Sequence, residues 1–144
     1  MVGRGGANNF CLTAASAPAL PGSYALAIDL CRRLSVRMAA TTETLAPGRY
    51  VYCGSAHGPG GLRARLMRHI RREKSVHWHV DQLTKVGAIR GAWVFPGGSE
   101  CELVAMLAHL PAPLAGFGSS DCDTCRSHLL YWPDHVPLPD CFEV

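Results

Sequence analysis

The chain has 144 residues, of which 48% are hydrophobic and 17% are charged. This length and composition fit one globular domain and exclude a disordered tail. The formal net charge of +3 is too small to establish a polyanion as partner, so the distribution of the basic residues matters more than their sum. No stretch approaches the ~20 consecutive apolar residues that cross a bilayer, which excludes a membrane span.

The chain contains seven cysteines, an odd number. Because no convincing secretory signal accompanies them, they predict a reducing, cytoplasmic compartment. The apolar run near the start is too short and too interrupted for the core of a signal peptide. The small residues from Ala14 to Ala19 resemble a cleavage site, so export stays as the alternative.

The first residues differ in composition from the rest of the chain, since they are rich in Gly, Ala, Ser, Asn and Pro. We therefore expect a flexible leader over 1–21 and a single domain over 22–144. From Tyr24 to Leu30, larger and smaller side chains alternate with the period of a strand. Residues 34–38 and 49–53 predict two further strands.

A glycine-rich turn at 57–61 separates these strands from a predicted helix. Leu62, Leu66 and Ile70 recur every four residues, which is close to the period of an α-helix. We expect this helix to end near Lys74.

The second half of the domain predicts a strand over 87–95 and a helix over 100–109 that is capped by Ser99. The chain beyond Leu110 is expected to be mostly irregular. The predicted strands are too closely spaced for repeated crossover connections. The order therefore predicts a small α/β domain with a mostly antiparallel central sheet flanked by helices.

Two short motifs and the helix behind them carry a resemblance to a known family. Gly22-Ser23-Tyr24 opens the first strand, Tyr52-Cys53-Gly54 closes a later one, and Arg65 and His69 follow on the helix. This order resembles the GIY-YIG nuclease family over roughly residues 22–110. The resemblance implies a GIY-YIG-like fold with the motifs on neighbouring strands. The interval between the motifs is much longer than in homing nucleases.

The C-terminal half resembles one uncharacterised, single-domain branch of that family. The resemblance lies in residues 116–122, 127–129 and 76–79. Domains of this branch are sometimes fused to endonuclease III-like glycosylases that excise bases. By analogy, the fusion implies a role in DNA repair, with base-excision repair proteins as partners.

The resemblance assigns four catalytic residues. Tyr24 is the expected general base or water-positioning phenol, with Tyr52 hydrogen-bonded in the same cluster. A phenol has an ordinary pKa near ~10, so it serves as a base only beside a cation. Arg65 is such a cation and offers a planar fork of donors to phosphate, while His69 is a candidate proton donor or phosphate ligand. The alternative is that both tyrosines only pack the core.

The resemblance also implies one metal-binding carboxylate on the second helix. Glu102 matches the family's glutamate by its order in the chain, and Glu100 is the competitor. One carboxylate, with water and phosphate at the other positions, suits a single Mg²⁺ or Mn²⁺ ion.

Basic residues are concentrated on and behind the first predicted helix. Arg65, His69 and Arg72 are separated by four and three residues, which places them on one face. The backbone N–H groups of residues 58–61 could meet a phosphate at the start of that helix. The alternative is a solvated helical face. The candidate contacts to nucleic acid are Arg68, Arg71, Arg72 and Lys74.

Two histidines flank a tryptophan just after the basic segment. His77 and His79 are candidate site residues, because they lie in a segment shared with the family branch. The alternative is a histidine packed in the core or at its rim. Asp81 is close enough in sequence to orient either imidazole.

The spacing of Cys122, Cys125 and His128 suits zinc, but structural zinc takes four ligands. Buried reduced thiols are the expected arrangement, and structural Zn²⁺ is the alternative. The candidates for the missing ligand are Cys101, Cys141 and His135.

These patterns together predict a metal-dependent endonuclease that hydrolyses phosphodiester bonds in DNA. A chain of this size has little surface to read a long sequence, so cleavage selective for DNA structure or damage is expected. The alternative is a catalytically inactive nucleic-acid-binding module, which needs only the basic residues. A third hypothesis is an interaction domain organised by zinc.

Overall fold

A computed structural model describes residues 9–118 and 125–139 of the chain. Its main sheet has five strands in the order β1-β6-β2-β5-β7, and every neighbouring pair is antiparallel. The strands are β1 (Phe10–Cys11), β2 (Gly22–Leu30), β5 (Gly48–Ala56), β6 (Ala88–Pro96) and β7 (Leu129–Trp132). The sequence-based expectation of a small α/β domain with a mostly antiparallel sheet is confirmed.

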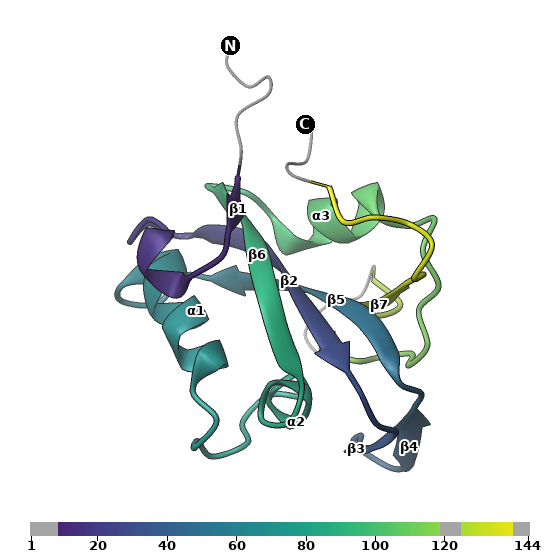
Figure 1. Cartoon of the computed structure of the whole chain (residues 1–144). Coiled ribbons are helices and arrows are strands. Elements are labelled where there is room, and N and C mark those ends of the chain that lie inside the picture. The colour runs from purple at the N-terminus through teal and green to yellow at the C-terminus, as the bar shows by residue number, and fades with distance from the viewer. Residues whose placement is uncertain (1–8, 119–124, 140–144) are drawn as a thin grey trace.

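Helices cover both faces of this sheet (Figure 1). One face packs against α1 (Gly61–Ile70) and α2 (Asp81–Thr84), with Tyr24, Leu26 and Ile28 of β2 in this core. The other face packs against α3 (Glu100–Met106), where the core contains the small Ala25 and Ala27 of β2, and Trp93 of β6 fills the space. The alternation of large and small residues along β2 therefore separates two cores of different thickness.

A second, two-stranded sheet lies between β2 and β5 in the chain. It consists of β3 (Leu34–Arg37) and β4 (Thr42–Leu45), which form an antiparallel hairpin. The backbone of Arg37 exchanges two hydrogen bonds with the side-chain amide of Gln82, at 2.8 and 2.9 Å. This hairpin accounts for the long interval between the two motifs, and β2 and β5 still pair along their whole length.

Residues 10–17 are part of the fold, and the expected flexible leader does not describe them. The ring of Phe10 packs at a tilt against Trp93, with centroids 4.8 Å apart, and β1 pairs with β6. A 3-10 turn (η1, Ala14–Ser16) follows, with Ala14 and Ala17 buried. The small residues of this segment predict little burial, but in the structure they allow close packing against α1.

Two helices end earlier than their sequence patterns predict. The helix α1 ends at Ile70 because Arg71 is extended, and the Lys74 amine donates to the last carbonyls, those of Arg68 and His69. The helix α3 ends at Met106 in a turn. The short strand β7 and the helix α2 were not predicted, because four residues are too few to show a period.

Candidate active site

The two motif tyrosines lie on paired strands and face α1. Tyr24 is directly opposite Gly54, and the rings of Tyr24 and Tyr52 are 6.3 Å apart. A Cβ atom at Gly54 would lie 2.5 Å from the Tyr24 hydroxyl, so this position requires glycine. The second motif thus supplies Tyr52 to the cluster, and its Gly54 leaves room for the hydroxyl of Tyr24.

A hydrogen bond joins Tyr24 to the first helix. Its hydroxyl lies 2.6 Å from Nε2 of His69, which is fully buried on the inner face of α1. Burial raises the pKa of Tyr24 well above its ordinary value, aided by Tyr52 and opposed by Arg65. Burial and then the Lys74 charge lower the pKa of His69 to about 3. Both groups are therefore neutral at neutral pH.

The depressed pKa of His69 makes stability fall in acid. Below pH 6.5, the ordinary pKa of histidine, His69 binds a proton in the unfolded chain but stays neutral in the folded protein. The free energy of unfolding should therefore decrease from pH 6.5 towards 3, by up to ~1.4 kcal/mol per pH unit from this group. Urea unfolding between pH 7 and 4.5 measures this slope. A His69→Gln variant with the wild-type slope would show that another group causes it.

A cleft of about 220 Å³ opens beside this pair. Arg65 forms part of its wall, since its guanidinium lies 4.5 Å from the centre of the Trp78 ring and donates to the Ser55 carbonyl at 2.7 Å. These contacts fix the cation at the side of the cleft. The lining residues come from β5, α1, α3 and two loops: Tyr52, Ser55, Arg65, His77, Trp78, His79, Glu100 and Gly118.

The carboxylate at this cleft belongs to Glu100, and the expected ligand Glu102 is elsewhere. Glu102 is exposed and lines a different hollow, with Ser23 and Leu103, on the α3 face of the sheet. Residues two apart on a helix point in directions ~200° apart, so both cannot reach the same site. Glu100 begins α3, where the helix meets the edge of the cleft.

The two candidate histidines both line the cleft, but Asp81 does not orient their imidazoles. His79 accepts a hydrogen bond at Nδ1 from the backbone N–H of Gly118, at 2.9 Å. Asp81 accepts from the backbone N–H groups of His77 and Trp78, at 2.8 and 3.0 Å. The histidine segment is thus held by its backbone.

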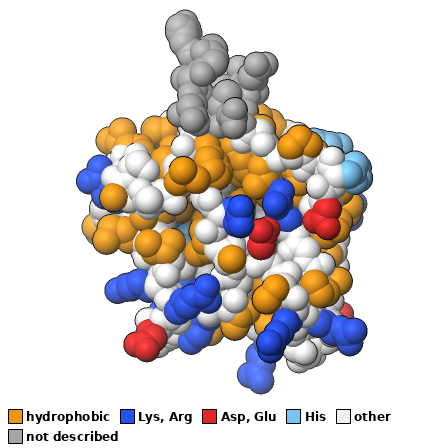
Figure 2. Space-filling view, viewed as in Figure 1, with side chains coloured by type: hydrophobic (Ala, Val, Ile, Leu, Met, Phe, Trp, Pro, Cys, Tyr) orange, Lys and Arg blue, Asp and Glu red, His pale blue; other side chains and the backbone are white. Residues whose placement is uncertain are grey.

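Most of the candidate nucleic-acid contacts make bonds within the protein. Arg68 donates to both carboxylate oxygens of buried Asp81, at 2.7 and 3.0 Å, and stacks on Trp78. Arg72 donates to two backbone carbonyls of the chain leading into β6, and Lys74 caps α1. Arg71 is exposed and keeps the proposed role. Figure 2 shows one face of the molecule, on which the Lys and Arg side chains lie mainly in the lower part of the view.

The start of α1 is closed by the preceding chain. The N–H of Leu62 donates to the Leu20 carbonyl at 2.8 Å, and the N–H of Arg63 donates to the Pro18 carbonyl at 3.1 Å. The Arg63 side chain also donates to Ala17. Within residues 58–61, the N–H of Gly61 donates to the Gly58 carbonyl at 3.1 Å, so the N–H groups of residues 61–63 are already hydrogen-bonded within the protein.

Several cleft residues were missed by sequence reasoning. Ser55 and Gly118 contribute through the backbone, which leaves no pattern in side-chain type. Trp78 was noted only as the neighbour of two histidines, yet it stacks with two arginines. Both arginines lie on α1 three residues apart, and this spacing is the signal that could have indicated a shared partner.

Residues 23–143 match the model of one protein family, described as a domain of unknown function, DUF123. No curated protein matches the chain. No solved structure matches it either. Within the described ranges, no helix has the length and apolar character to span a membrane.

Proposed function

Because this chain belongs to the DUF123 family, whose function is unknown, we propose its function from the cleft: it is a metal-dependent endonuclease of the GIY-YIG type that acts on DNA. The observation that carries the proposal is the convergence of Arg65, Glu100 and Tyr52 in one cleft, backed by the Tyr24–His69 pair. A cation can stabilise the charge that develops on the phosphate, a carboxylate can bind a metal ion, and a phenol can position water, which are roles that phosphodiester hydrolysis uses.

Glu100 is the proposed protein ligand of one Mg²⁺ or Mn²⁺ ion. Its half-buried carboxylate is a hard oxygen donor at the cleft wall, and an open cleft leaves the other positions to water and phosphate. Bound there, the ion would stabilise charge on a phosphate oxygen and lower the pKa of water. The negative charge of Glu100 also contributes to the raised pKa of Tyr52, second to burial, which a bound cation would offset.

Arg65 is the proposed phosphate contact. Trp78 and the Ser55 carbonyl hold its guanidinium before a substrate arrives, so little side-chain freedom is lost on binding. The Ser55 carbonyl accepts from one donor of the planar fork, and further donors of the guanidinium would bind phosphate oxygens in the cleft.

The two phenols have different proposed roles, because they lie at different depths from the cleft. Tyr52 reaches the cleft and would position the attacking water, whereas Tyr24 lies behind it with its hydroxyl on His69. When Nδ1 of His69 carries the ring proton, Nε2 accepts the hydrogen bond from Tyr24, which holds that phenol in place behind the cleft. Burial raises the pKa of both phenols, so Arg65 and the bound cation must favour the phenolate.

The test is cleavage of labelled duplex, single-stranded, flap and abasic DNA with Mg²⁺, Mn²⁺ or EDTA. We expect cutting that needs the divalent ion and differs between DNA forms. Tyr52→Phe and Tyr24→Phe should each lower single-turnover rates by about 10²–10⁴, with DNA affinity retained. Tyr50→Phe is the matched control, because its hydroxyl donates to Ala46 outside the cleft.

Three outcomes would contradict the proposal. Binding to DNA without cleavage of any form would instead support a catalytically inactive nucleic-acid-binding module. Cleavage that survives EDTA would remove the metal from the mechanism. Equal activity of the Tyr52→Phe and Tyr50→Phe variants would eliminate the cleft phenol as a participant.

A further inference from the structure

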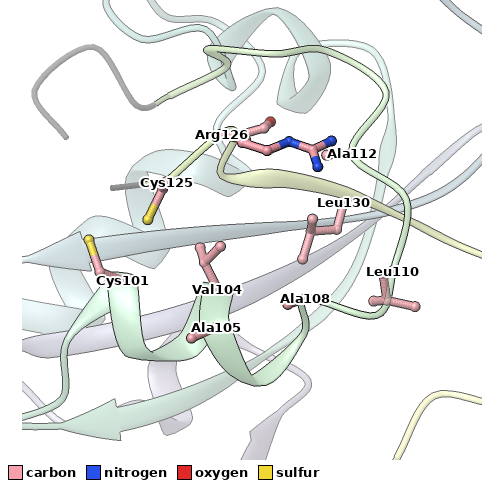
Figure 3. A pocket seen from close by; sticks show the side chains of 10 residues that line it. Cys101, Val104, Ala105, Ala108, Leu110, Ala112, Cys125, Arg126 and Leu130 are labelled. Atoms are coloured by element: carbon pink, nitrogen blue, oxygen red, sulfur yellow. The ribbon is translucent and has the colours of Figure 1, made fainter. Parts of the chain in front are cut away.

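A second cluster of reactive side chains lies where α3 begins and β7 approaches. Cys101 comes from α3, while Cys125 and His128 come from the segment just before β7. One ligand atom from each lies within 4.8 Å of the other two. Figure 3 shows the sulfur atoms of both cysteines facing each other at one end of a pocket between these segments. We propose that Cys101, Cys125 and His128 bind a structural Zn²⁺ ion.

The environment of His128 points to a ligand independently of the spacing. The residue is 1% exposed, and neither ring nitrogen has a hydrogen-bond partner among residues 9–118 and 125–139. Its Nδ1 faces a Glu100 oxygen at 3.6 Å, which exceeds the length of a hydrogen bond. A buried polar group without a partner costs free energy, and a metal bond would remove that cost.

The donor set selects the metal. Two thiolates and an imidazole are soft or borderline ligands, which favour zinc over the hard ions Mg²⁺ and Mn²⁺. Bond lengths of ~2.3 Å for Zn–S and ~2.0 Å for Zn–N put tetrahedral ligands ~3.5–3.8 Å apart. The observed limit of 4.8 Å therefore needs only a small contraction to form the site.

A tetrahedral zinc site needs a fourth ligand, and His135 does not supply it. His135 is exposed and is not a member of the cluster. Cys122 and Cys141, the other candidates, lie outside the described residues. A fourth ligand would complete the tetrahedron, and the three placed ligands carry the proposal.

The proposed ion would join two segments that meet through few backbone bonds. It would fix the first turn of α3 to the chain that enters β7, and β7 pairs with β5 beside Tyr52. Glu100 precedes Cys101 and faces His128, so the zinc would also hold that carboxylate at the cleft wall. Zinc binding itself does not depend on the proposed nuclease activity.

The experiment is zinc analysis of the full chain, purified under reducing conditions without a histidine tag. We expect about one zinc per chain. Replacement of zinc by Co²⁺ should give a thiolate-to-cobalt charge-transfer band, which reports sulfur ligands directly. Cys101→Ser, Cys125→Ser and His128→Ala should each bind zinc at least about tenfold more weakly. Cys31→Ser, at an exposed cysteine outside the cluster, should bind as the wild type does.

The wild-type protein alone keeps the proposal falsifiable if the variants do not fold. Zinc content no higher than background, with no uptake of added Zn²⁺ or Co²⁺ by folded protein, would overturn it. A Cys101–Cys125 disulfide found by mass analysis in the same preparation would also overturn it. Zinc content is measured without DNA, so this result is independent of the nuclease test. We also expect that Mg²⁺ added after EDTA treatment does not occupy the zinc site.

Discussion

Glu100→Gln is expected to lower the rate of DNA cleavage by about 10²–10⁴, while Glu102→Gln keeps the wild-type rate. The two glutamates are two residues apart on α3 and differ in where their side chains lie. Glu100 lines the cleft with Arg65 and Tyr52, whereas Glu102 is exposed on the α3 face of the sheet. Their substitutions remove the same charge from the same helix, so each is the matched control of the other.

Single-turnover rates at saturating enzyme and equilibrium DNA binding separate chemistry from affinity in these two variants. We expect binding by Glu100→Gln to be retained or slightly strengthened, because a negative charge near the phosphate is lost. Titration with Mn²⁺ should recover part of the rate, since an amide oxygen is a weaker ligand than a carboxylate. A larger loss of cleavage rate in Glu102→Gln than in Glu100→Gln would contradict this assignment and make Glu102 the metal ligand.

Asp81→Asn is expected to lower the free energy of unfolding by about 3 kcal/mol. The Asp81 side chain is fully buried and accepts hydrogen bonds from Arg68 and from two backbone N–H groups. Burial alone would raise the pKa of Asp81, but these donors outweigh it and lower the pKa to about 2. The neutral amide would leave the guanidinium without its counter-charge.

Asp29→Asn is the control for this loss. Asp29 also pairs with an arginine, Arg49, at 3.1 Å, but its side chain is 30% exposed, so its removal should cost less than about 1 kcal/mol. Urea unfolding of both variants at pH 7 measures the difference. The contribution of Asp81 should persist above its ordinary pKa of about 4 and disappear as the pH falls towards 2. Equal stability of the two variants would show that burial does not strengthen the Arg68 pair.

Sequence reasoning located the sheet and half of the cleft, because those features leave periodic or paired signals. The alternation along β2 and the glycine opposite Tyr24 are consequences of strand geometry, and they are visible in the order of residues. The turn of a helix also placed His69 on the face shared with Arg65. Both residues accordingly lie beside the tyrosines in the structure.

The remaining features depend on contacts between distant segments. The order of residues does not show whether Glu100 or Glu102 lines the cleft, because this depends on how α3 crosses the end of the sheet. Charge alone suggested that Arg68 binds nucleic acid, but its partner Asp81 lies thirteen residues away on another helix. The pairing of β1 with β6 likewise rests on the fit of Phe10 against Trp93.

The β3–β4 hairpin gives this fold a place where chain length can change during evolution. The pairing of β2 with β5 holds the tyrosines in register through its own hydrogen bonds, from Gly22 opposite Ala56 to Leu30 opposite Gly48. Residues added or lost at the hairpin tip, between Met38 and Thr41, would therefore leave the distance between the phenols unchanged. The interval between the two tyrosines in the chain is thus independent of the distance between them in the fold.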